Sequence, residues 1–134
     1  MTPLDLLKKI SESAGRLRRV MGYYFEGSDG LLSHLVLEFD SGRLTLSAVE
    51  DDDTIALSGE ALRLDASKEY VREVKTLSAA RDRTLFWGWT MTNHQGYPDG
   101  VRLEFRNTVS DPAVAFEVIV VASKLKVYVV TEAG

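Results

Sequence analysis

The chain has 134 residues, 45% of them hydrophobic and 27% charged, which suffices for one globular domain with a buried core. Its formal net charge of −4 argues against nucleic-acid and anionic-membrane partners, because both require a positively charged surface. Cysteine is absent, which excludes disulfides and thiolate chemistry and fits a cytoplasmic location.

The first residues predict a short helix over 2–13. Thr2 suits the N-cap, Pro3 suits the first turn, and Gly15 is a typical residue just beyond a helix end. We expect the helix to dock on a sheet through the face that carries Leu4 and Leu7.

Strand patterns follow in quick succession. We expect a strand over 19–26 and a hairpin over 35–49, where apolar and polar residues alternate on both sides of a tight turn. Residues 51–68 resemble a less ordered connection. The pattern of residues 67–79 fits either a helix or a strand, and the helix is the favoured interpretation.

The second half of the chain predicts four more strands. Two of them, over 84–92 and 101–105, flank a polar turn, and two more cover 115–122 and 125–130. The strand over 115–122 is apolar on both faces, which is typical of a strand buried on both sides in the middle of a sheet.

Residues 14–39 resemble residues 80–105 at a constant shift of 66 positions, which aligns Gly22 with Gly88. The pattern predicts an α+β fold, mainly an antiparallel sheet or half-open barrel built from two similar halves, with one or two short helices. We expect residues 1–134 to form a single domain.

The polar turn of the second half is the stretch of the sequence most typical of a binding site. It combines amides, an imidazole, a phenol and a carboxylate on a loop between two strands, where binding groups often lie. Its residues are Asn93, His94, Gln95, Tyr97 and Asp99, and its counterpart in the first half includes Glu26 and Asp29. Turn formation alone is the alternative interpretation, since both segments contain strong turn formers.

A run of acids forms the second candidate site: Glu50, Asp51, Asp52 and Asp53. Carboxylates suit hard cations, but these acids are consecutive, whereas a calcium loop spaces its ligands at alternate positions. We therefore expect a solvated turn or a protein-contact surface and no metal site. The two histidines lack the spacing of metal ligands, and no pattern indicates a cofactor.

Trp87 and Trp89 flank Gly88 in an expected strand, together with Leu85 and Met91. Alternation would place the two indoles on one face with those apolar side chains. A ligand-stacking platform is one interpretation, and core packing is the favoured one, because tryptophan supplies a large buried area to a small sheet.

Three segments, GLLSHLVLEF (30–39), LTLSAVEDDDTI (44–55) and TNHQGYPDGVRLEF (92–105), resemble a family of short bacterial proteins known only as a domain of unknown function. The resemblance covers about residues 16–130. It implies no activity, cofactor or site residue.

The function therefore stays unknown at this level. The leading hypothesis is a small acidic, non-enzymatic, cytoplasmic protein-binding domain, with toxin neutralisation (an immunity-type role) as one concrete version. The alternative is a small-ligand-binding or enzymatic domain that uses the loop over 92–100. Self-association into a homo-oligomer through a sheet edge is a third hypothesis.

Overall fold

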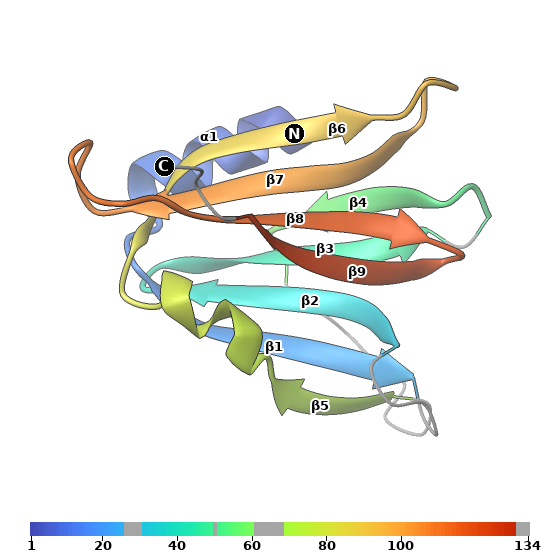
Figure 1. Ribbon diagram of the computed structural model, residues 1–134, viewed down its shortest axis with the longest axis horizontal. Helices are drawn as coiled ribbons and strands as arrows, with labels where there is room; N and C mark the ends of the chain where they lie inside the picture. Colours follow the sequence, from blue (N-terminus) through green and yellow to red (C-terminus); the bar gives the residue numbers. More distant parts are fainter. Residues whose placement is uncertain (26–30, 50, 61–68, 131–134) are drawn as a thin grey trace.

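The computed structural model describes residues 1–25, 31–49, 51–60 and 69–130. Within these ranges, nine strands form one antiparallel sheet that curls into a half-open barrel, and two short helices accompany it (Figure 1). The expected fold of a mainly antiparallel α+β protein with one or two short helices is confirmed.

A helix comes first and is followed by four strands. A fifth strand and a second, 3₁₀ helix come next, and four more strands come last. The elements are α1 (Pro3–Ser13), β1 (Leu17–Phe25), β2 (Leu32–Phe39), β3 (Gly42–Val49), β4 (Thr54–Ser58), β5 (Glu69–Glu73), η1 (Lys75–Ala80), β6 (Thr84–Thr92), β7 (Pro98–Arg106), β8 (Val114–Val121) and β9 (Lys124–Val130).

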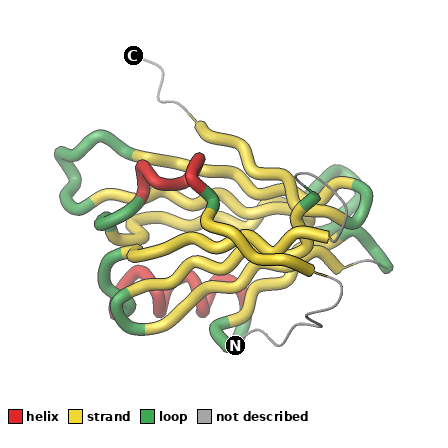
Figure 2. Tube along the Cα trace, turned by 90° about the horizontal axis from the view of Figure 1, so that it is seen from below, coloured by secondary structure: helices red, strands yellow, loops and turns green. Residues whose placement is uncertain are grey.

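The sheet has two arms. One arm contains β5, β1, β2, β3 and β4 in that spatial order, and the other contains β9, β8, β7 and β6. The arms join where Leu32 of β2 pairs with Leu125 of β9. At the end of the sheet opposite to this pair, Arg16, just before β1, forms an isolated bridge with Thr84 of β6. The two helices lie apart from each other on the sheet, as Figure 2 shows.

The N-terminal helix forms as its sequence predicts. Thr2 caps it, because the Thr2 hydroxyl accepts from the Asp5 amide while the Asp5 carboxylate accepts from the Thr2 amide. Its buried side chains are Leu6, Leu7 and Ile10. Leu4 is 56% exposed, so the docking face is rotated away from the expected one.

The prediction of a helix over residues 67–79 is wrong for residues 69–73. Residues Glu69–Glu73 form β5, which pairs antiparallel with β1. Only Lys75–Ala80 are helical, as the 3₁₀ helix η1. Backbone partners on β1 decide between two conformations that the local pattern permits equally.

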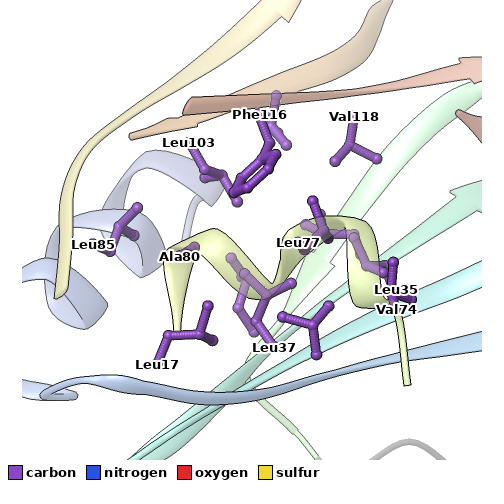
Figure 3. Close-up of a cluster of buried hydrophobic side chains, with 14 of the residues drawn as sticks. Leu17, Leu35, Leu37, Val74, Leu77, Ala80, Leu85, Leu103, Phe116 and Val118 are labelled. Atoms are coloured by element: carbon purple, nitrogen blue, oxygen red, sulfur yellow. The ribbon is translucent and has the colours of Figure 1, made fainter. Parts of the chain in front are cut away.

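The core lies between the two arms, and η1 enters it from one side. Leu77 and Ala80 of η1 are buried among side chains from both arms, including Leu37 of β2 and Phe116 of β8 (Figure 3). Fully buried residues of this cluster are spread over most of the strands, so folding requires contacts between distant parts of the chain.

Two further expectations change. Residues Thr54–Ser58 form a strand, β4, inside the segment expected to be a connection. The strand β8 is buried mainly on one face, which carries Phe116, Val118 and Val120. On its other face Ala115 is buried, Ile119 is half-buried and Val121 is 42% exposed. The apolar pattern on the second face of β8 therefore reports a partly exposed surface and not a second core.

The hairpins β1–β2 and β6–β7 share an unusual pairing pattern. Leu17 pairs with Phe39 and Leu85 with Phe105, and in each hairpin the following residue of the first strand is skipped. The first strands thus match at a shift of 68 positions (17 to 85) and the second strands at 66 (39 to 105). A gapless shift of 66 does not describe the first strands, since Gly22 pairs with Leu35 while Gly88 pairs with Leu103.

Candidate functional site

Three turns lie at one end of the sheet, on the right of Figure 1: 51–53 between β3 and β4, 93–97 between β6 and β7, and 122–123 between β8 and β9. Because antiparallel strands alternate in direction, every second turn must lie at the same end. This end carries the candidate residues that the structure describes. Glu26, Asp29 and Glu50 lie outside the described residues.

The polar loop between β6 and β7 uses its polar groups largely within itself. The Asn93 side-chain oxygen accepts from the backbone amides of Gln95 and Tyr97, and the Asn93 side-chain amide donates to Asp99. His94, Gln95 and Tyr97 are exposed. The hydrogen bonds of Asn93 form the turn, so the loop brings few unengaged groups toward a common point.

The acidic run forms the turn between β3 and β4. Asp52 accepts from the backbone amide and the hydroxyl of Thr54, at 3.1 and 2.6 Å. Asp53 accepts from Ser123 of the neighbouring β8–β9 turn. Asp51, Asp52 and Asp53 are exposed.

The sheet exposes three large aromatic side chains on its outer face. Trp87 and Trp89 of β6 are 56% and 42% exposed, and Tyr128 of β9 is 47% exposed. The expectation that both tryptophans pack in the core is therefore wrong. An exposed group of large aromatic side chains is unusual on a small globular domain and typical of a contact surface.

The pairing of β6 with β7 explains why the tryptophans face outward. Leu85 pairs with Phe105 and is buried, but Phe86 is an extra residue, so Trp87 pairs with Glu104. The inserted residue reverses the alternation of side chains along the strand. Gly88 then faces inward, where an added Cβ would lie 3.1 Å from Leu7 Cδ1.

Four side chains form a continuous row across the outer face. Trp89 pairs with Arg102, Arg102 with Glu117, and Glu117 with Tyr128, on four consecutive strands. The Arg102 guanidinium lies 5.5 Å from the centre of the Trp89 ring and 3.3 Å from a Glu117 carboxylate oxygen. We call Trp87, Trp89, Arg102, Glu117 and Tyr128 the tryptophan face.

The arginine of this row is held between its neighbours. Its side chain is 34% exposed and that of Glu117 is 28% exposed, so the ion pair is half-buried at the centre of the row. A cation over an indole and beside a carboxylate loses conformational freedom before any partner arrives, which lowers the entropic cost of binding.

His34, the histidine on β2, makes its contacts within the sheet. Its Nδ1 lies 2.7 Å from the Ser33 hydroxyl, and its ring and that of Tyr23 lie nearly perpendicular, with their centres 6.4 Å apart. His34 pairs with both Tyr23 and Ser47, so it lies in an interior strand and not at a sheet edge. Among the described residues, no group of three or more His, Asp or Glu side chains is arranged to hold a metal ion.

A hollow of about 420 Å³ lies between α1 and the end of β4, where Leu6, Lys9 and Leu57 form part of its wall. None of the candidate residues of the polar loop or the acidic turn lines it. Neither described helix has the length and apolar content needed to cross a lipid bilayer.

These features define a class: a small half-open antiparallel barrel with an exposed aromatic face. The chain belongs to a family of unknown function, DUF6334, whose model matches residues 2–134. Comparisons with curated proteins and with solved structures found no match. The family confirms the resemblance to a domain of unknown function and leaves the activity open.

Proposed function

We propose that this chain is a non-enzymatic protein-binding domain whose contact surface is the tryptophan face. The exposure of Trp87, Trp89 and Tyr128 beside a half-buried arginine carries the proposal. Trp, Tyr and Arg dominate the binding energy of protein interfaces, because they combine a large apolar area with directed polar groups. Removing these aromatic surfaces from water is favourable in proportion to the area covered.

A more specific form of the proposal is a toxin-neutralising role in a bacterial cytoplasm. The net charge of −4 and the exposed Asp51 and Asp52 support it, since an acidic surface attracts and orients a basic partner. Asp53 of this acidic turn accepts a hydrogen bond from Ser123, in the turn between β8 and β9. These two strands carry Glu117 and Tyr128. The acids would then steer the approach while the aromatic side chains supply the affinity.

The alternative, a ligand site in the loop over 92–100, has less support. Asn93 uses its side-chain oxygen twice within the turn and its amide on Asp99. A binding site needs polar groups that converge on a ligand and are not already engaged with each other.

The proposal extends to the architecture. The shared pairing irregularities of the β1–β2 and β6–β7 hairpins support a chain built from two similar halves. In such a chain, the two copies have diverged on their outer faces. Arg19 and Met21 of β1 occupy the positions that Trp87 and Trp89 occupy on β6, so only the second half presents the aromatic pair.

The test is affinity capture from the native host with four versions of the full-length protein. We expect the wild type to retain a protein that the double variant Trp89→Ser, Tyr128→Ser does not retain. A charge variant, Asp51→Asn with Asp52→Asn, should reduce the rate of association at low salt and have little effect at high salt. His94→Ala with Tyr97→Ala serves as the control for the polar loop.

Recovery of free protein alone from every version, at low salt as well, would contradict the proposal. Loss of binding in the loop variant with retention in the Trp89→Ser, Tyr128→Ser variant would instead favour the alternative site.

A further inference from the structure

The strand β6 has one open edge. It pairs with β7 along its whole length, and on its other side the described residues pair with it only at Thr84, through the bridge to Arg16. In Figure 1, β6 is the uppermost strand of its arm and α1 lies behind it. The backbone groups that point away from β7 between Leu85 and Thr92 therefore have no strand partner in the described part of the chain.

The sequence of this edge strand lacks the short length and the charged residues that protect the other edges, and α1 packs beside it. Natural proteins shield open edges with short strands, charges, prolines or lysines. The edge strands β4 and β5 have five residues each, and β9 carries two lysines. The nine residues of β6, TLFWGWTMT, include no charged residue and no proline. An unprotected edge of this length is a place where another strand can pair.

A groove runs beside this edge. The groove has a volume of about 290 Å³ and is enclosed by α1 on one side and by Phe86, Trp87 and Gly88 on the other. Leu4 of α1 is 56% exposed there, and Leu7 lies beneath Gly88. The lack of a side chain at Gly88 lets Leu7 of α1 pack directly against the strand, so α1 forms one wall of the groove.

We propose that the open edge of β6 takes up an extended segment of a partner protein, an uncharged stretch with apolar side chains at alternate positions. The segment adds a strand to the sheet through main-chain hydrogen bonds. Its inward side chains enter the groove against Leu4 and Leu7, and its outward side chains contact Trp87 and Trp89. This inference rests on the proposed protein-binding function and names how the partner is held.

The chemistry of the groove selects this occupant. Its walls carry four apolar side chains, Leu4, Leu7, Phe86 and Trp87, beside the Ser11 hydroxyl, and its two charged residues, Lys8 and Glu12, have opposite signs. A second copy of β6 fits less well. Its inward side chains are Leu85, already buried in its own core, Gly88 and Thr90, and the last two are too small to fill the groove.

The experiment starts with a library of random 12-residue peptides displayed on phage and selected against the full-length protein. We expect the selected peptides to alternate apolar and other residues and to lack a shared charge. Two variants then test the site: Leu4→Glu places a carboxylate in the groove, and Val109→Glu places one on a residue that is 77% exposed. A Glu in the first turn suits a helix N-terminus, so the fold of the first variant should persist.

The expected result is that Leu4→Glu abolishes binding of the selected peptides while Val109→Glu leaves it unchanged. Amide hydrogen exchange followed by NMR gives the direct readout. In the free protein, alternate amides of β6 should exchange fast, because only every second one donates to β7. At a peptide concentration about 100 times Kd, these fast amides should slow by up to about 100-fold.

Several results would overturn the inference. One is a library that yields no peptide sensitive to Leu4→Glu. Another is the finding that all β6 amides are protected in the free protein and that the protein sediments as a dimer. Together these two results would mean that a second copy occupies the edge. A host partner that needs Trp89 and Tyr128 but leaves the β6 amides unprotected would uphold the proposed function and reject strand addition.

Discussion

Asp53 and Ser123 link two turns that are 70 residues apart in the chain: the Ser123 amide and hydroxyl both donate to one Asp53 carboxylate oxygen, at 2.7 and 3.0 Å. Asp53 also has a positive φ of 54°, a left-handed conformation that favours glycine. Asp53 therefore stabilises the fold through a long-range contact and destabilises it through an unfavourable backbone conformation.

Substitutions at Asp53 should separate these two effects. Asp53→Gly removes the contact and relieves the backbone, so we expect it to lower the free energy of unfolding by about 0.5–1 kcal/mol at most. Asp53→Ala removes the contact and keeps an unfavourable backbone, so its loss should be larger by about 1 kcal/mol. Urea denaturation measures both. Equal stability of the two variants would contradict the left-handed assignment.

The two strand glycines should differ in their tolerance of alanine. A Cβ at Gly22 would lie 2.8 Å from Val74 Cγ2 and 2.9 Å from Leu32 Cδ2, and both neighbours are buried. A Cβ at Gly88 would lie 3.1 Å from Leu7 Cδ1. We expect Gly22→Ala to cost about 1–3 kcal/mol of stability by overpacking and Gly88→Ala to cost less.

Chemical denaturation of the two glycine variants checks this order. A larger loss for Gly88→Ala would mean that β6 approaches α1 more closely than β1 approaches η1.

Acid should destabilise the protein through Asp40 and Glu38. A hydrogen bond from the Arg18 side chain, with a second from the Arg16 amide, lowers the pKa of Asp40 below its ordinary 3.8. A hydrogen bond from Arg19 lowers the pKa of Glu38 below 4.5. A lowered pKa in the folded state means that the unfolded state binds protons first, so this stabilisation is present above the ordinary pKa values and is lost as the pH falls through the folded ones.

We therefore expect the free energy of unfolding to decrease from roughly pH 5 to below pH 3, with a smaller slope in the Asp40→Asn and Glu38→Gln variants. Denaturation curves over this range measure the slope. Glu12→Gln, which removes an exposed acid on α1, controls for the change in net charge. Identical slopes in all four proteins would show that these ion pairs do not contribute.

The tryptophans provide a direct test of the outer face. Since both indoles are about half exposed, acrylamide should quench their fluorescence with a slope approaching that of a free tryptophan derivative. Trp87→Phe and Trp89→Phe assign the signal to each residue. Neither substitution should change stability by more than about 0.5 kcal/mol, because exposed sites rarely do. Quenching as weak as that of a buried indole would place them in the core after all.

Short-range patterns were sufficient for many of the elements. Thr2 and Pro3 define the start of α1, and alternation predicts the β2–β3 hairpin and both ends of β6 at Thr84 and Thr92. These features depend on neighbouring residues, on capping groups and on side-chain period, all of which are present in the linear chain. The polar turn after β6 is equally local, since Asn93 bonds within it.

Other features depend on residues that are far apart. Whether Tyr70 and Val71 are helical or extended is decided by pairing with β1, some fifty positions earlier in the chain, and β4 exists because β3 offers it a partner. The orientation of Trp87 is decided by one inserted residue, Phe86. A bulge exchanges the two faces of a strand, and no residue type in the sequence reveals where it occurs. The tertiary pairing, and not the alternation of residues, therefore determines which aromatic side chains reach solvent.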